Sequence, residues 1–307
     1  MSCTSCIKAN EAAKRGHLVC LQDISSKPRF TWNSKDHKGA AILASRYGHL
    51  ECLKFSHQRG CPLDDISNLE VGEYIIEKDI VNASIIDGHL DCLRYAHQKA
   101  GVELTEDAFI VASVKGHLNC IEYLHQQALE WYSGTIAICA RYGNLVCLKY
   151  AYENGAPYEK ENFDIQDEEG NGQIVDCSPE TIASAYGRLD CLKYLCSKDP
   201  LQHLETIEFA IQYKHLECAR YLIEQEFPCV VTDHWIYEGR LSYQHLDDPV
   251  WRDFLFNKAI LSKAPSVQRL VNQKKSEIEQ TKKACMCLFS ENKIPEDIVK
   301  YILYVYF

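Results

Sequence analysis

The chain has 307 residues, of which 46% are hydrophobic and 25% are charged, and its formal net charge is −10. This is an ordinary globular composition, long enough for one elongated repeat array or two compact domains. The acidic balance lacks the clustered Lys and Arg that neutralise phosphates, so we expect no nucleic-acid partner. No run approaches the roughly 18 apolar residues that a membrane span needs, so we expect no membrane partner.

The first residues of the chain are polar and contain no apolar core of signal-peptide length. The sixteen cysteines would indicate disulfides in a short secreted chain, but this chain is long and spaces many of its cysteines regularly. Reduced thiols are the better interpretation, and they are typical of the cytosol and the nucleus. We therefore expect a cytoplasmic or nuclear protein.

An eight-residue pattern recurs along the chain, most clearly as Gly-His-Leu-Glu-Cys-Leu-Lys-Phe from Gly48. Apolar residues before and after the glycine follow a period near 3.6, which predicts two helices joined by a tight turn. The glycine is expected to end the first helix in a left-handed conformation, where a Cβ is unfavourable. Lys214 departs from this rule, so we expect a strained turn there. The seven copies begin at Gly16, Gly48, Gly88, Gly116, Gly143, Gly187 and Lys214.

Repetition on this scale predicts a solenoid, because one short helical pair cannot bury its own apolar face and must stack on its neighbours. We expect an all-α helix-turn-helix solenoid of about seven repeats, followed by a C-terminal helical segment. The repeat array is assigned to residues 1–239 and the C-terminal helical cap to residues 240–307. Within the cap, the apolar pattern predicts one helix over residues 266–289 and a last helix from Ile294.

Two connections between helical pairs are long and acidic, at residues 60–78 and 156–177. Segments of this kind leave a stacked core and face solvent, so both are expected as loops. Each is either a solvated insertion or a finger that binds a partner. Plain short loops are expected after the other pairs, because copies only 27 residues apart leave little room for more.

Cysteines recur four residues after the glycine, on the inner face of the second helix, where a small and weakly polar side chain packs well. Thiols one repeat apart are separated by roughly 10 Å, which is too far for a disulfide or for shared zinc ligation. The CxxC pair of Cys3 and Cys6 lacks a matching second pair nearby, and Cys285 and Cys287 form a CxC on a predicted helix. We therefore expect no metal. The repeat cysteines are Cys20, Cys52, Cys92, Cys120, Cys147, Cys191 and Cys218.

Histidines also recur at fixed places, at the turn and nine residues after the glycine, whereas a catalytic histidine would be singular. An aromatic column seven residues past the glycine is interpreted as core or groove packing, with an exposed ladder for a partner as the alternative. No nucleophile elbow, phosphate-cradling loop or HExxH motif occurs, so we expect neither an enzyme nor a cofactor. The columns are His17, His49, His89, His117 and His215 at the turn, then His57, His97 and His125, and the aromatic Phe55, Tyr95, Tyr123, Tyr150, Tyr194 and Tyr221.

The small residues before the turn, the Gly-His-Leu turn and the second helix together resemble the ankyrin repeat, across about residues 9–226. Ser178-Pro179 occupies the Thr-Pro slot of that family before Gly187, whereas the other copies lack it. The chain looks most like the shortened, cysteine-rich ankyrin repeats of large DNA viruses and some protists. The resemblance implies a protein-binding solenoid whose turn histidines hydrogen-bond the backbone of neighbouring repeats.

The end of the chain carries a second resemblance, in the stretch IPEDIVKYIL from Ile294. It is similar to the first helix of an F-box, and its place after ankyrin repeats is that of the PRANC arrangement in poxviruses. The leading Ile, the shifted acidic pair and the short stretch after Leu303 depart from the F-box pattern. The resemblance implies docking into the adaptor of a cullin-RING ubiquitin ligase as a helix in a groove. The implied partner-binding residues are Ile294, Pro295, Ile298, Ile302 and Leu303.

Two functional hypotheses follow, and both are non-enzymatic. In the first, the array binds a cellular protein and residues 290–307 recruit a ubiquitin ligase, so that the chain is a substrate receptor. In the second, the chain is a plain scaffold or decoy whose last helix only caps the repeat stack. Both hypotheses predict protein partners for a monomeric chain, and the sequence identifies none of these partners.

Overall fold

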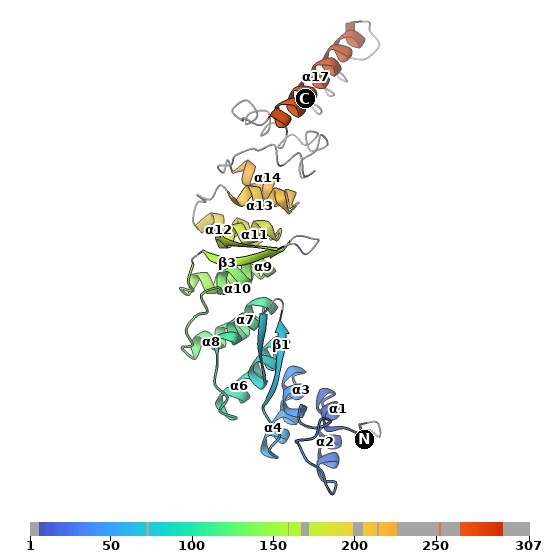
Figure 1. The fold of residues 1–307 in the computed structure, drawn as a ribbon, viewed down its shortest axis with the longest axis vertical. Helices are drawn as coiled ribbons and strands as arrows, with labels where there is room; N and C mark the ends of the chain where they lie inside the picture. Colours follow the sequence, from blue (N-terminus) through green and yellow to red (C-terminus); the bar gives the residue numbers. More distant parts are fainter. Residues whose placement is uncertain are drawn as a thin grey trace. The chain divides into compact units, whose positions relative to one another are not determined.

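The computed structural model describes residues 6–71, 74–158, 160–166, 172–198, 205–213, 215–225, 252 and 265–290. In these ranges short helices pair in chain order and successive pairs pack together, as the sequence repeats predict (Figure 1). The chain divides into two compact units. None of the helices in the described ranges is both long enough and apolar enough to cross a bilayer.

The first unit comprises residues 1–166, 171–183 and 188–199, and each sequence copy in it forms one helical pair. Its helices and strands are α1 (Ala9–Lys14), α2 (Leu18–Ser25), α3 (Ala40–Arg46), α4 (Leu50–Gln58), β1 (Asp64–Val71), β2 (Tyr74–Asp79), α5 (Ile80–Ile86), α6 (Leu90–Gln98), α7 (Glu106–Lys115), α8 (Leu118–Gln126), α9 (Thr135–Tyr142), α10 (Leu145–Glu153), β3 (Glu161–Gln166), β4 (Gly172–Cys177), α11 (Pro179–Ala185) and α12 (Leu189–Lys198).

The core lies mainly between the first helices of successive pairs, because α3 packs on both α1 and α5, and α7 packs on both α5 and α9. Every residue of α5 is buried, including the polar Asn82 and Ser84. The second helices form a parallel layer in which α4 contacts α6, α6 contacts α8 and α8 contacts α10. This two-layer stacking is the continuous core that a repeat array requires.

The tight turn inside each pair follows the expected chemistry. Gly116 ends α7 in the left-handed region at φ 76°, and its N–H donates to the carbonyl of Ala112. A side chain with a Cβ is strained in this region, which explains why the column is glycine.

The two long connections form antiparallel hairpins, so the expectation of loops at 60–78 and 156–177 is corrected (Figure 1). In the first hairpin the pairing runs from Asp64 with Asp79 to Val71 with Tyr74, and its register shifts after Asp65. In the second, β3 pairs with β4 without a shift. Both segments contain runs of β-branched and aromatic residues, which favour strands over irregular loops. Strands therefore add to an otherwise helical fold, and β2 packs on α5 and α7.

The second unit contains residues 184–187, which end α11 and its turn, together with the chain from residue 200 onward. Here α13 (Glu205–Gln212) packs on α14 (Leu216–Glu224), which confirms the seventh helical pair. The Ser184 hydroxyl donates to the Thr206 carbonyl at 2.9 Å. The helix expected over residues 266–289 is present as α17 (Pro265–Ser290). The Lys214 turn and the last helix from Ile294 lie outside the described residues.

Candidate protein-binding surface

The partner-binding residues implied by the F-box resemblance lie outside the described part of the chain, so the structure does not place them. The candidate surface therefore has to be found in the repeat array. Residues that make contacts between repeats have a structural role, so a binding surface is expected among the remaining residues. The residues left without a position are Ile294, Pro295, Ile298, Ile302 and Leu303.

The turn residues hold neighbouring repeats together through one recurring backbone group. In several repeats, the carbonyl two residues before the turn glycine accepts a hydrogen bond from the turn side chain of the next repeat. Carbonyls in the last turn of a helix have no intrahelical donor, so this bond satisfies them. The histidine ties implied by the ankyrin resemblance are present for two of the histidines. The bonds are His49 Nε2 to Lys14 O (3.1 Å), His117 Nε2 to Ile86 O (3.0 Å), Asn144 Nδ2 to Val114 O (3.1 Å) and Arg188 Nε to Arg141 O (2.9 Å).

The later histidines and the aromatic column meet each other across repeats. Four tyrosine hydroxyls of the column each bond a side chain in the last turn of the second helix of the preceding pair, and the aromatic rings are buried or half-buried. These contacts favour the packing interpretation over an exposed ladder for a partner. The bonds are Tyr95 with His57 (2.9 Å), Tyr123 with His97 (2.9 Å), Tyr150 with His125 (3.0 Å) and Tyr194 with Glu153 (3.2 Å).

The cysteine column is buried, as expected for a packing position. For five of these thiols, loss of solvent raises the pKa because the charged thiolate is disfavoured in an apolar environment. A thiol with such a pKa is neutral near pH 7 and is a poor nucleophile and metal ligand. The pKa is raised to about 11 for Cys52, Cys92, Cys147 and Cys191, and to about 12 for Cys120.

In the first repeat, a second thiol and a histidine lie beside the column cysteine. Cys6 Sγ lies 3.2 Å from His17 Nδ1. The Sγ atom of Cys20 lies close to both, and the ligand atoms of the three residues are all within 4.8 Å of one another. Cys6 was not connected with His17 and Cys20 from the sequence, because His17 and Cys20 also occupy repeat positions.

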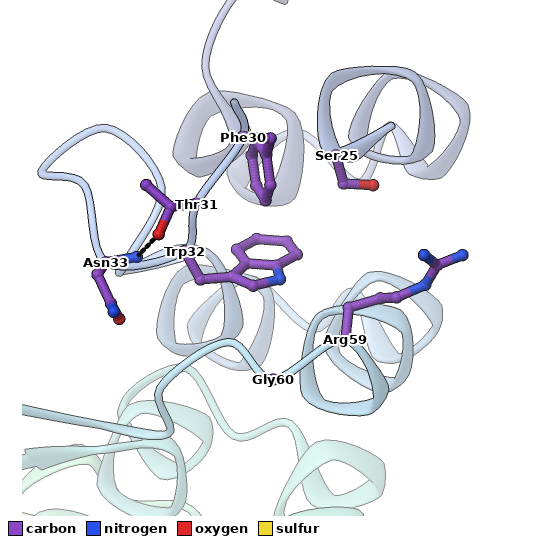
Figure 2. A pocket seen from close by; sticks show the side chains of 7 residues that line it. All are labelled: Ser25, Phe30, Thr31, Trp32, Asn33, Arg59 and Gly60. Atoms are coloured by element: carbon purple, nitrogen blue, oxygen red, sulfur yellow. Dashed lines mark hydrogen bonds between the residues drawn. The ribbon is translucent and has the colours of Figure 1, made fainter. Parts of the chain in front are cut away.

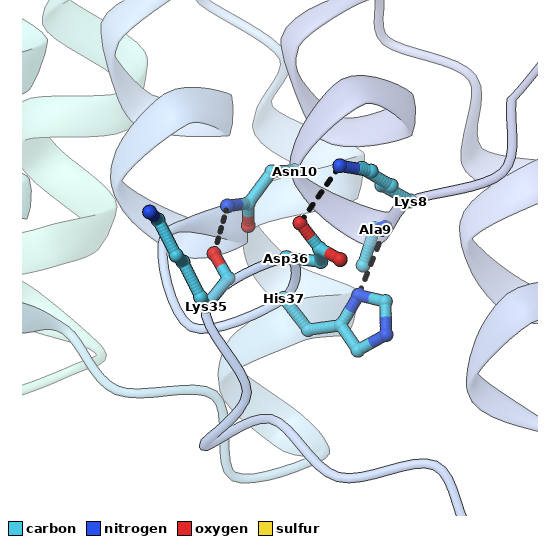
Figure 3. Close-up of polar contacts among 6 residues, drawn as sticks. All are labelled: Lys8, Ala9, Asn10, Lys35, Asp36 and His37. Carbon is cyan, nitrogen blue, oxygen red and sulfur yellow. Dashed lines mark hydrogen bonds and ion pairs between the residues drawn. The ribbon is translucent and has the colours of Figure 1, made fainter.

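The segment between α2 and α3, residues 26–39, is fixed onto the start of α1 (Figure 3). Lys8 forms an ion pair with Asp36 at 2.9 Å, and the Ala9 N–H donates to His37 Nδ1 at 3.2 Å. The hydrogen bond from Lys8 lowers the pKa of the Asp36 carboxyl. Asn10 Nδ2 donates to the carbonyl of Lys35 at 3.2 Å. This segment therefore has a defined conformation.

A pocket of about 360 Å³ opens between this segment and the end of α4. Figure 2 shows the Trp32 ring beside Phe30, with Arg59 on the opposite side of Trp32 from Asn33. Phe30 and Trp32 meet edge to face at 4.8 Å between ring centroids, and Trp32 is only 9% exposed. The residues that line the pocket are Ser25, Phe30, Thr31, Trp32, Asn33, Arg59 and Gly60.

The exposed lining of the pocket is mostly polar and includes one cation, Arg59. The Arg59 guanidinium lies 5.3 Å from the centroid of the Phe55 ring. In the described ranges no carboxylate forms an ion pair with Arg59, so its five N–H donors can reach a ligand group. Such a site can take a carboxylate or carbonyl group of a partner protein.

None of these pocket residues was predicted from the sequence. One signal could have found them. Gly16 and Gly48 are 32 residues apart, five more than the closest copies of the repeat, and the extra residues include the aromatic stretch Phe30-Thr31-Trp32.

A scan against protein-family models and a search of curated proteins found no match to this chain.

Proposed function

We propose that this chain is a non-enzymatic protein-binding module built as an ankyrin-type solenoid. The ankyrin assignment is supported by three features: the left-handed turn glycine, the turn histidine that ties adjacent repeats, and hairpins between helical pairs. The observation that carries the function is the contrast between two groups of residues. The periodic His and Tyr side chains bond one another between repeats, whereas the residues that line the pocket at Trp32 and Arg59 lie outside the repeated eight-residue pattern.

The experiment is capture of bound proteins from cells that express the tagged full chain, compared with an Arg59→Glu variant. Reversal of the charge in the pocket should abolish capture of the specific partners, because a carboxylate repels the acceptor group that Arg59 would bind. Lys99→Glu is the matched control, since Lys99 is exposed, makes the same charge change and lies outside the pocket. Capture by wild type and K99E but not by R59E supports the proposal. The binding role fails if wild type captures nothing above background, and the pocket assignment fails if R59E captures the same set.

A second proposal is ligase recruitment by residues 290–307, and the observation that favours it is the F-box-like sequence from Ile294. In that case the captured protein would be the substrate of a cullin-RING ubiquitin ligase. Wild-type protein should then retain the ligase adaptor in a pull-down. Ile298→Asp and deletion of 290–307 should both release it, because a buried carboxylate is incompatible with an apolar groove. A wild-type chain that retains no adaptor would end this proposal.

The scaffold alternative makes a different prediction for the same deletion. If residues 290–307 only cap the stack, their removal should expose apolar surface and lower the melting temperature by several degrees. Circular dichroism of the deletion variant and of wild type provides the measurement. An unchanged melting temperature would contradict the capping role.

A further inference from the structure

The first repeat brings together three side chains that bind transition metals. The Cys6 thiol precedes α1, His17 lies in the turn between α1 and α2, and Cys20 lies on the inner face of α2. Cys6 Sγ is 3.2 Å from His17 Nδ1, and one ligand atom from each residue lies within 4.8 Å of the others. In the described part of the chain this is the one group of at least three His, Cys, Asp or Glu residues with such spacing.

His17 makes a different contact from those of His49 and His117. His49 and His117 use Nε2 to bind a carbonyl of the preceding repeat. Each of their rings also lies on the turn glycine of that repeat. His17 lies in the turn between α1 and α2, in the first helical pair of the described residues. Its ring instead meets the segment before α1, where Cys6 supplies a sulfur.

The spacing fits the ligand shell of zinc. Zinc–sulfur bonds of about 2.3 Å and zinc–nitrogen bonds of about 2.0 Å place tetrahedral ligand atoms about 3.5 to 3.8 Å apart. The observed Sγ–Nδ1 distance of 3.2 Å and the upper limit of 4.8 Å bracket these values. Rotation of side chains is therefore enough to form the site. Cys20 is buried and the other two ligands are half-buried, so the site is partly closed to solvent.

The sequence adds two pairs with the spacing common among zinc ligands. Cys6 is the second cysteine of a CxxC whose first member is Cys3, and His17 and Cys20 form an HxxC. Two such pairs, separated by ten residues, supply four potential ligands. Cys3 lies outside the described residues, so the argument rests on the other three.

We propose that Cys6, His17 and Cys20 bind one Zn²⁺ ion. Binding replaces the thiol protons of Cys6 and Cys20, which pass to solvent, and it leaves the metal in its divalent state. The ion would join the segment before α1 to the inner face of α2. Because an ion that binds only the folded chain stabilises it, zinc would raise the stability of this helical pair.

The test uses the reduced full chain, loaded with zinc, desalted and measured for zinc content. Wild type should retain about one zinc ion per chain, and loading should raise its melting temperature. Cys6→Ser, His17→Ala and Cys20→Ser should each lower the retained zinc at least tenfold, the typical loss when a metal site is disturbed. Loading with Co²⁺ should give the thiolate-to-metal absorption band of wild type and no band in C6S or C20S.

Cys52→Ser is the matched control, since Cys52 occupies the same position as Cys20 in the next repeat. C52S and C20S lose the same buried thiol, so both should lose similar stability in the absence of metal. Only C20S should lose zinc. Wild type that retains less than about a tenth of a zinc ion per chain would overturn the proposal, as would equal zinc loss in C52S and C20S. A melting temperature insensitive to zinc would overturn the stabilising role of the ion.

Discussion

At the residue scale, the turn glycines are restricted by two separate physical effects. Gly48 has φ 74°, and a Cβ built there would lie 2.5 Å from Nδ1 of His89 in the next repeat. Gly101 has φ 73°, but a Cβ there would meet nothing within 4 Å. The two positions share the backbone conformation and differ only in the neighbour, so they separate backbone strain from steric exclusion.

We predict that Gly101→Ala lowers the free energy of unfolding by about 1 kcal/mol, the cost of a Cβ in the left-handed region. Gly48→Ala should lower it by about a further 1 to 3 kcal/mol, because the methyl group displaces the packed His89 ring. Urea unfolding of both variants provides the measurement. Adding His89→Ala to Gly48→Ala should recover part of the extra loss, and equal losses in the two single variants would contradict the steric account.

At the element scale, the hairpin and helix between the second and third repeats meet at one residue. Asp79 ends β2 and is the N-cap of α5, where its side chain accepts a hydrogen bond from the Asn82 N–H at 2.7 Å. The corresponding N-cap of α7, Thr105, forms no such side-chain bond. A cap that accepts this bond satisfies a backbone donor of the first helical turn.

Asp79→Ala should therefore lower the free energy of unfolding by about 1 to 2 kcal/mol, since the Asn82 N–H is buried and would lose its acceptor. Thr105→Ala should change it by less than about 0.5 kcal/mol, because Thr105 is exposed and its side chain forms no cap bond. Thermal melts followed by circular dichroism would compare the two. A Thr105 variant as destabilised as the Asp79 variant would show that the cap bond is not the cause.

At the scale of the whole molecule, buried thiols in successive repeats make stability depend on pH in the same direction. The ordinary pKa of these thiols is 9.0, and burial raises it to about 11 at several repeat positions. Between these values the unfolded chain loses protons while the folded chain keeps them. The unfolded state then binds fewer protons, so the free energy of unfolding falls as pH rises.

The melting temperature should therefore be constant between pH 7.5 and 8.5 and fall between pH 9 and 10, before the lysine and tyrosine side chains dominate the titration. Calorimetry across this range gives the measurement. Cys52→Ala removes one of the contributing thiols, so its melting temperature should depend less steeply on pH. A wild-type melting temperature that does not change up to pH 10 would contradict this account.

The sequence predicted most of the repeat architecture, because helical period, turn glycine and thiol column each follow from one local pattern. The seven helical pairs and the long helix α17 are where the period placed them. The hairpins were missed because acidic residues such as Asp64 and Glu161 were interpreted as signs of a solvated loop. The β-branched residues beside them, which favour strands, were not taken into account. The group of Cys6, His17 and Cys20 was missed because His17 and Cys20 also occupy repeat positions, and their proximity to Cys6 depends on how the segment before α1 lies against the turn.

The match between each turn glycine and the next histidine has a consequence for how such a chain can evolve. The space left by the missing Cβ of Gly48 is occupied by His89, and that left by Gly88 is occupied by His117. The joint is therefore shared by two neighbouring units and has the same form in both. A duplication or deletion that runs from one glycine to the next restores a complementary joint, so arrays of this type can change length by whole units. The joints at Asn144 and Arg188 carry different side chains, and there the exchange of units requires a compensating substitution.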